Sequence, residues 1–184
     1  RMGWGALVLC AIVQAAAAER PEAEVFAPGI VSLPERIEFC LAMTPDENEV
    51  FFAVRRAPGQ WEIRHARRVG DSWETPANAP FSGVYSDCEP TLSPDGRRLF
   101  FVSNRPVPPE TEAADYNIWL VEREEGGWSA PRPLPPPVNG PGDQWRASQS
   151  RAGTLFYSSG GLWSCGFDGT AVTEPPRLFD PRQP

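Results

Sequence analysis

The residues SPDGRRLFFVS at positions 93–103 decide the fold of this chain. The first four predict a tight turn, because Pro presets a backbone angle, Asp hydrogen-bonds back to the chain and Gly accepts a positive φ. The run LFFV at positions 99–102 is apolar without polar alternation, which is typical of a β-strand covered on both faces. We expect this run to be the best-buried part of its unit.

The same turn and strand occur twice more in the sequence. Residues 44–52 (TPDENEVFF) match residues 93–101 at a shift of 49 positions, and residues 150–157 (SRAGTLFY) form a weaker copy. A second block, residues 61–76, matches residues 116–131 at a shift of 55 positions. A period of this length predicts a propeller or another array of sheets, and the difference between the two shifts locates an insertion at residues 105–115.

Each repeat is interpreted as four strands. In the middle unit we expect them over residues 88–93, 98–103 and 117–123, with a short fourth strand at Trp128. A sheet that is apolar on both faces must stack against its copies, and radial stacking gives a propeller. Tryptophans at equivalent strand positions support blade packing: Trp61, Trp73, Trp119, Trp128 and Trp163. The predicted fold class is therefore all-β: a partial β-propeller of about three four-stranded antiparallel blades.

Composition agrees with many short strands and argues against some partners. The 184 residues include 22 Pro and 16 Gly, which break helices and form turns. All 17 basic residues are Arg, scattered among 24 acidic residues, and the net charge is −7. Because nucleic-acid binding needs concentrated positive charge, we do not expect a nucleic-acid partner.

The beginning of the chain predicts export. Residues 2–18 form an apolar run that ends in four alanines, as in a secretory signal peptide cleaved near Ala18. The apolar core at residues 6–13 is much shorter than the roughly 20 residues of a membrane span. We therefore expect a periplasmic or secreted protein with no membrane span in the mature chain. The expected organisation is a signal peptide (1–18), an N-terminal extended segment (19–37), blade 1 (38–80), blade 2 (81–137) and blade 3 (138–184).

These motifs resemble a known repeat. Residues 93–105, followed by NIW at 117–119, resemble the WD40-like repeat of TolB-type propellers. Three further segments resemble an exported bacterial subgroup of that family: 80–87 (PFSGVYSD), 137–139 (PVN) and 153–159 (GTLFYSS). The resemblance covers about residues 25–165.

The resemblance implies a ring of six blades that holds a peptide segment of an envelope partner at its channel mouth. The chain supplies three blades, and the third ends near residues 179–181 with little sign of a full last strand. We interpret the sequence as part of a longer gene product; the alternative is that two copies complete a ring. Half a ring leaves two exposed blade faces, which also predict self-association.

The sequence lacks the usual signs of a metal, a cofactor or a hydrolase. Its one histidine, His65, lies among arginines and is predicted to be a solvated strand residue. Residues 161–166 (GLWSCG) have the wrong spacing for a nucleophile elbow, and no histidine follows them. We therefore expect no metal, no cofactor and no catalytic residue.

The candidate site lies where the first strand of each blade would begin. In a propeller these strands line the channel, so the side chains at their entry, together with Glu35, would ring one mouth of it. The candidate ligand-binding residues are Glu38, Asp87, Glu89, Asn104, Arg105, Asp143 and Trp145. The acids could instead cap turns and pair with arginines, and Trp145 could stack on a ligand or plug the axis.

The function predicted from these observations is a non-catalytic binding or scaffolding propeller that recognises a protein or peptide of the cell envelope. The alternative is a carbohydrate-active propeller enzyme that uses two channel-mouth carboxylates as acid and base. The mature chain has three cysteines, an odd number. A bridge between Cys40 and Cys88 is conceivable, but we favour buried free thiols.

Overall fold

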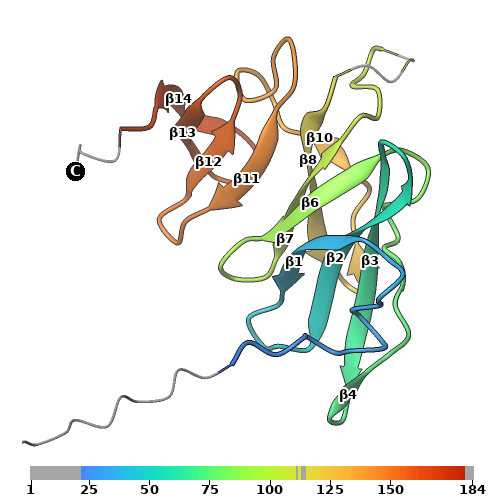
Figure 1. Ribbon diagram of the computed structural model, residues 1–184. Coiled ribbons are helices and arrows are strands. Elements are labelled where there is room, and N and C mark those ends of the chain that lie inside the picture. Colours follow the sequence, from blue (N-terminus) through green and yellow to red (C-terminus); the bar gives the residue numbers. More distant parts are fainter. Residues whose placement is uncertain (1–21, 111, 113–114, 181–184) are drawn as a thin grey trace, which may run out of the picture.

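The computed structural model describes residues 22–110, 112 and 115–180, and every regular element among them is a β-strand. The expected signal peptide lies outside these residues. Figure 1 shows three sheets that follow one another along the chain. No helix in the described part of the chain is long and apolar enough to cross a membrane.

Each sheet is antiparallel, and its strands follow the order of the sequence. Blade 1 consists of β1 (Glu38–Met43), β2 (Glu49–Ala57), β3 (Gln60–Val69) and an outer edge divided into β4 (Ser72–Trp73) and β5 (Ala77–Asn78). Blade 2 consists of β6 (Asp87–Leu92), β7 (Arg98–Ser103), β8 (Asn117–Glu124) and the divided outer edge β9 (Gly127–Trp128) and β10 (Arg132–Pro133). Blade 3 consists of β11 (Trp145–Gln149), β12 (Thr154–Ser158), β13 (Leu162–Phe167) and β14 (Val172–Leu178). The predicted all-β, three-bladed partial propeller is confirmed.

Two local expectations were wrong. The sequence showed little sign of a last strand in blade 3, yet β14 is seven residues long and pairs with β13. Its prolines, Pro175 and Pro176, are tolerated because β14 is an edge strand. The segment expected to be extended at residues 19–37 is folded into turns in its described part, with a bridge from Pro28 to Ser32. These turns place Val31 against blade 1 with 2% of its surface exposed.

Apolar side chains from neighbouring blades form the core. Between blades 1 and 2, Phe81 lies between Phe51 and Phe101, at ring-centroid distances of 6.4 and 5.1 Å. The run at residues 99–102 is at most 1% exposed, as expected. Burial of each such side chain contributes roughly 1.5–3 kcal/mol. The five tryptophans expected in blade packing belong to these apolar clusters, although the strand register places Trp61 and Trp119 at different positions of their blades.

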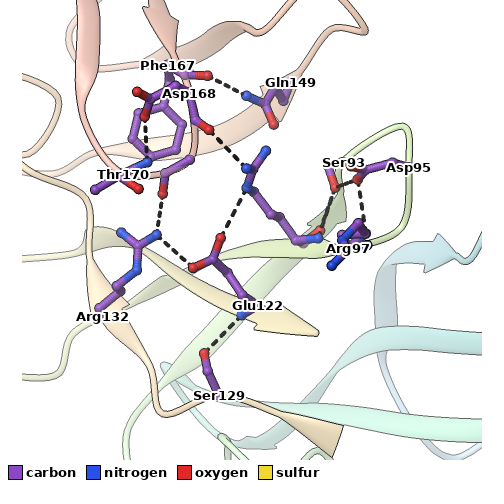
Figure 2. A network of polar contacts seen from close by, with 12 residues as sticks. Ser93, Asp95, Arg97, Glu122, Ser129, Arg132, Gln149, Phe167, Asp168 and Thr170 are labelled. Atoms are coloured by element: carbon purple, nitrogen blue, oxygen red, sulfur yellow. Dashed lines mark hydrogen bonds and ion pairs between the residues drawn. The ribbon is translucent and has the colours of Figure 1, made fainter. Parts of the chain in front are cut away.

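Charged side chains join the blades at the end where the turn between the first and second strand of each blade lies. Between blades 2 and 3, Arg98 donates to the carbonyl of Asp168 at 2.9 Å, and Arg132 donates to the carbonyl of Gly169. Within blade 2, Arg132 also donates to Glu122 at 3.1 Å (Figure 2). Burial alone would raise the pKa of Glu122, but hydrogen bonds from Arg132 and Arg98 lower it. Glu122 therefore stays ionised and holds two guanidinium groups against the β13–β14 turn.

His65 belongs to the corresponding contact between blades 1 and 2, so the expectation of a solvated residue was wrong. Its ring stacks on Phe51 at 4.5 Å, and Nε2 lies 2.9 Å from Oε2 of Glu49. Arg123 of blade 2 donates to the same carboxylate at 3.0 Å. Burial lowers the pKa of His65 below its ordinary value of 6.5, although the bond to Glu49 opposes this, and Arg67 and Arg123 lower it further. The sequence concealed this role because Arg123 is 58 residues away from His65 in the chain.

The first turn of blade 2 has the predicted chemistry. The Ser93 hydroxyl and the Arg97 amide donate to Asp95, and these hydrogen bonds lower the pKa of its carboxyl group. Gly96 has a φ of +68°, and a Cβ atom there would lie 2.8 Å from Cδ of Pro45 in the neighbouring blade. Gly96 is therefore required both by the turn and by the close approach of two blades.

We expect Gly96→Ala to lower the free energy of unfolding by about 2–4 kcal/mol, because it adds left-handed strain and an inter-blade overlap. Gly59→Ala is the matched control, because Gly59 has a similar φ of +71° but no atom within 4 Å of the place where a Cβ would lie. The control should lose only about 1 kcal/mol in urea unfolding. Equal losses in the two variants would exclude a role for the Pro45 contact.

We expect the stability of the protein to fall as the pH drops below 6.5, the ordinary pKa of histidine. The lowered pKa means that the folded state takes up the proton at a lower pH than the unfolded state, so acid favours unfolding in the window below 6.5. His65→Gln keeps a polar side chain but does not titrate. Urea unfolding between about pH 7.5 and 5 should therefore show a steeper loss for the wild type than for the variant. Parallel pH profiles would contradict this role.

Candidate functional site

The inner edge of the three sheets is formed by β1, β6 and β11, each of which is the first strand of its sheet. Each of these strands has an irregularity in its register within its first few residues. Cys40, Glu89 and Arg146 lie at these irregularities and have φ values of 52°, 52° and 57°. Non-glycine residues rarely adopt this conformation, and each costs of order 1–3 kcal/mol. We call these three residues the bulge triad.

Two members of the bulge triad are in direct contact across two blades. The amide of Arg146 in β11 donates to Oε2 of Glu89 in β6 at 2.9 Å, and Nε of Arg146 lies 3.6 Å from Oε1. The Glu89 side chain is 12% exposed, whereas the Arg146 side chain is 78% exposed. The edge therefore presents a guanidinium group to solvent beside a carboxylate that is largely covered.

Cys40 is the third member and lies in the same electrostatic neighbourhood. Partial burial and the charge of Glu89 raise the pKa of its thiol, while Arg146 lowers it. Cys40, Cys88 and Cys165 are all free thiols. Cys88 and Cys165 are buried as expected, but Cys40 is exposed, because the bulge changes the direction of its side chain. Burial raises the pKa of the Cys88 thiol strongly, so it stays protonated.

An aromatic cluster lies beside the bulge triad. Trp145 stacks on Tyr116 at 4.7 Å, and Phe39 meets Trp61 edge to face at 4.5 Å. These four rings surround a small buried group that includes Cys88. Trp145 is half-buried in this cluster, so part of its ring is committed to packing.

Asp87 and Arg105 form a buried ion pair. Nη2 of Arg105 donates to Asp87 at 2.7 Å, and the two side chains are 10% and 0% exposed. Ser82 also donates to Asp87 at 2.8 Å, and the guanidinium lies over the ring of Trp119 at 5.2 Å. The structure brings these two candidate residues together, but their groups are used to anchor the segment before β6.

The other candidate residues contact separate parts of the chain. Glu38 accepts from Arg36 at 2.7 Å, and Asn104 accepts from the amide of Ser86 at 2.9 Å. Asp143 accepts from the amide of Tyr116 at 2.8 Å, and Glu35 is exposed. No hydrogen-bond donor is shared by any two of the candidate acids Glu38, Asp87, Glu89 and Asp143. What remains available at the inner edge is the bulge triad and the half-buried Trp145.

Sequence reasoning named Glu89 but missed Cys40 and Arg146 as its equivalents. A signal was present, because Cys40 and Glu89 are separated by the same 49 residues as the first two turns. The positive φ gave no signal, since none of the three positions is glycine.

No protein-family model and no curated protein matches the sequence. Several solved structures share the fold, and two of them illustrate the likeness. TolB from Acinetobacter baumannii has a TM-score of 0.50 and 16% identity, over 77% of this chain and 32% of that one. A puromycin-hydrolysing peptidase of Mycobacterium tuberculosis has a TM-score of 0.51 and 18% identity, over 77% of this chain and 23% of that one. The chain thus spans a third or less of either structure, and the TolB-like propeller fold inferred from the repeats is confirmed.

We expect Asp87→Asn to lower the free energy of unfolding by about 3–5 kcal/mol, because it leaves the buried Arg105 guanidinium without its counter-charge. Asp143→Asn is the control, since its amide oxygen can still accept from Tyr116 at an exposed position, and should cost less than about 1 kcal/mol. Chemical denaturation of both variants measures the difference. A small loss for Asp87→Asn would return this pair to the ligand-binding candidates.

Proposed function

We propose that this protein is a non-catalytic binding or scaffolding propeller that recognises a protein or peptide of the cell envelope at its inner edge. The observation that carries the proposal is the bulge triad: three equivalent residues that hold a costly backbone conformation on neighbouring strands. Such strain persists only where the surrounding structure maintains it, and it clusters at ligand sites. Because the triad lies within the first three residues of each inner strand, it coincides with the channel mouth expected from the repeats.

The chemistry of the inner edge favours an acidic peptide segment. The Arg146 guanidinium is mostly exposed and offers several donors, which suit a carboxylate. The nearby Glu89 is covered and already accepts from Arg146, so it repels an acidic ligand less than an exposed carboxylate would. Leu41, 44% exposed, and the partly exposed Trp145 add apolar surface beside the charge.

A periplasmic or secreted location is part of the proposal. Its support is the signal-peptide pattern at residues 2–18 and the likeness of the fold to TolB. We also propose that the exposed faces of the end blades mediate self-association.

Hydrolysis is the competing function, because one structural neighbour is a peptidase and because propellers include carbohydrate-active enzymes. A glycosidase needs two carboxylates that flank one bond. The candidate acids instead bind separate structural partners, and Asp87 is fully buried. This arrangement supports binding over glycoside hydrolysis.

Fluorescence polarisation with labelled ten-residue peptides, each made in a Glu and a Gln version, tests the binding proposal. We expect the wild type to prefer the Glu versions and Arg146→Glu to weaken their binding at least about tenfold, equivalent to ~1.4 kcal/mol. Arg151→Glu is the matched control, because Arg151 is also exposed but lies in the turn at the opposite end of β11. Equal binding of Glu and Gln peptides would contradict the proposal. So would turnover of nitrophenyl glycosides or aminoacyl nitroanilides that Glu89→Gln abolishes.

A further inference from the structure

A phenylalanine occupies the same position of the second strand in each repeat, and in blades 1 and 2 it faces the following blade. Phe51 in β2 packs against Phe81, which lies between blades 1 and 2. Phe100 in β7 packs against Phe167 of blade 3 at 6.2 Å. The third equivalent is Phe156 in β12. Its neighbours Leu155 and Tyr157 belong to the cluster shared with blade 2, so alternation along the strand places Phe156 on the opposite face.

That face of blade 3 is open. Phe156 is only partly buried and contacts Phe179 edge to face at 5.4 Å. Leu162 pairs with Ser158 and therefore lies on the same face as Phe156; Leu162 is 44% exposed and Phe179 is 37% exposed. A hollow of about 190 Å³ is lined by Phe156 and Phe179 together with polar residues that include Thr154, Ser164 and Arg177. The face therefore has apolar side chains of the kind that blades 1 and 2 bury, set among polar ones, and nothing in the described residues covers it to the same degree.

The other end of the stack is different, because residues 25–36 cover blade 1. Val31 lies on Phe52, and both are at most 2% exposed. The segment has the same position relative to its blade as the connections that carry Phe81 and Val138, which lie inside the two inter-blade clusters. Its outer side remains apolar: Val25 is 65% exposed, and Phe26, which contacts Trp73, is 37% exposed.

The described residues thus contain, at opposite ends, the two surfaces that meet at each inter-blade interface: the Phe156 face of blade 3 and the segment 25–36 on blade 1. We propose that two copies associate head to tail, with the open face of blade 3 of each copy against the segment 25–36 and blade 1 of the other. This inference rests on the self-association proposed above and adds its geometry. Propellers typically have four to eight blades, and the described residues of two copies supply six. A closed pair leaves neither of the two described end faces open.

Size-exclusion chromatography with light scattering on the full chain tests this inference. We expect twice the 20.3 kDa mass of one chain. Phe156→Asp and Phe26→Asp should each raise the dissociation constant at least about tenfold, because each places a charge in one half of the interface. Val84→Asp is the matched control, since Val84 is 80% exposed but lies at neither end, and it should remain dimeric. An equimolar mixture of the Phe156→Asp and Phe26→Asp chains should regain dimers through one intact contact.

The remaining outcomes separate the parts of the proposal. If Phe156→Asp dissociates the dimer and Phe26→Asp does not, two blade 3 faces meet each other and the head-to-tail arrangement is wrong. A monomeric wild type would overturn self-association altogether without affecting the peptide assay, and masses that grow with concentration would exclude a closed pair. Leu162→Asp, at a position 44% exposed on the same face as Phe156, provides a second test if Phe156→Asp fails to fold, as judged by circular dichroism.

Discussion

Apolar side chains on both faces of the second strand of each blade are the constraint on which the rest of the structure depends. Phe51 and Phe52 in β2 point to opposite sides and are both at most 1% exposed, as are Phe100 and Phe101 in β7. Such a sheet loses roughly 2 kcal/mol or more for each large side chain left in water, so it must be covered on both sides. The neighbouring blades, the connecting segments and the N-terminal turns all serve this requirement.

Polar groups at the blade interfaces fix how one blade is positioned against the next. The Glu122 carboxylate accepts hydrogen bonds from Arg98 and Arg132, which both contact blade 3. The Glu49 carboxylate contacts His65 of its own blade and Arg123 of the next blade. The Glu49 side chain is only 16% exposed, so an alternative stacking would leave a covered charge unpaired, which is costly away from water; the Glu122 side chain is 40% exposed. The charged network therefore specifies the register between blades, while the phenylalanines provide most of the stabilisation.

The inner edge is arranged differently from these interfaces. There the backbone itself is strained at three equivalent positions, and the side chains at those positions differ in chemistry: a thiol, a carboxylate and a guanidinium. A repeated backbone feature with varied side chains is what a binding surface needs, because the fold supplies the positions and each blade supplies a different group. The inter-blade core varies less, since the same phenylalanine position must fill the same space in each repeat.

The sequence alone determined the three repeats within this chain, the turns and the buried strands, because these depend on local patterns such as Pro94-Asp95-Gly96 and the run at 99–102 that follows it. It did not reveal β14, because the strand contains two prolines, which are unusual in strands and are tolerated here only because β14 is an edge strand. Nor did it show that Asp87 is buried with Arg105, that His65 and Arg123 of the next blade share the Glu49 carboxylate, or that Cys40 is exposed. Only the tertiary structure decided these points. Burial, ion pairing and left-handed backbone at non-glycine residues arise from contacts between segments tens of residues apart. A local sequence pattern does not identify the distant residue that makes such a contact.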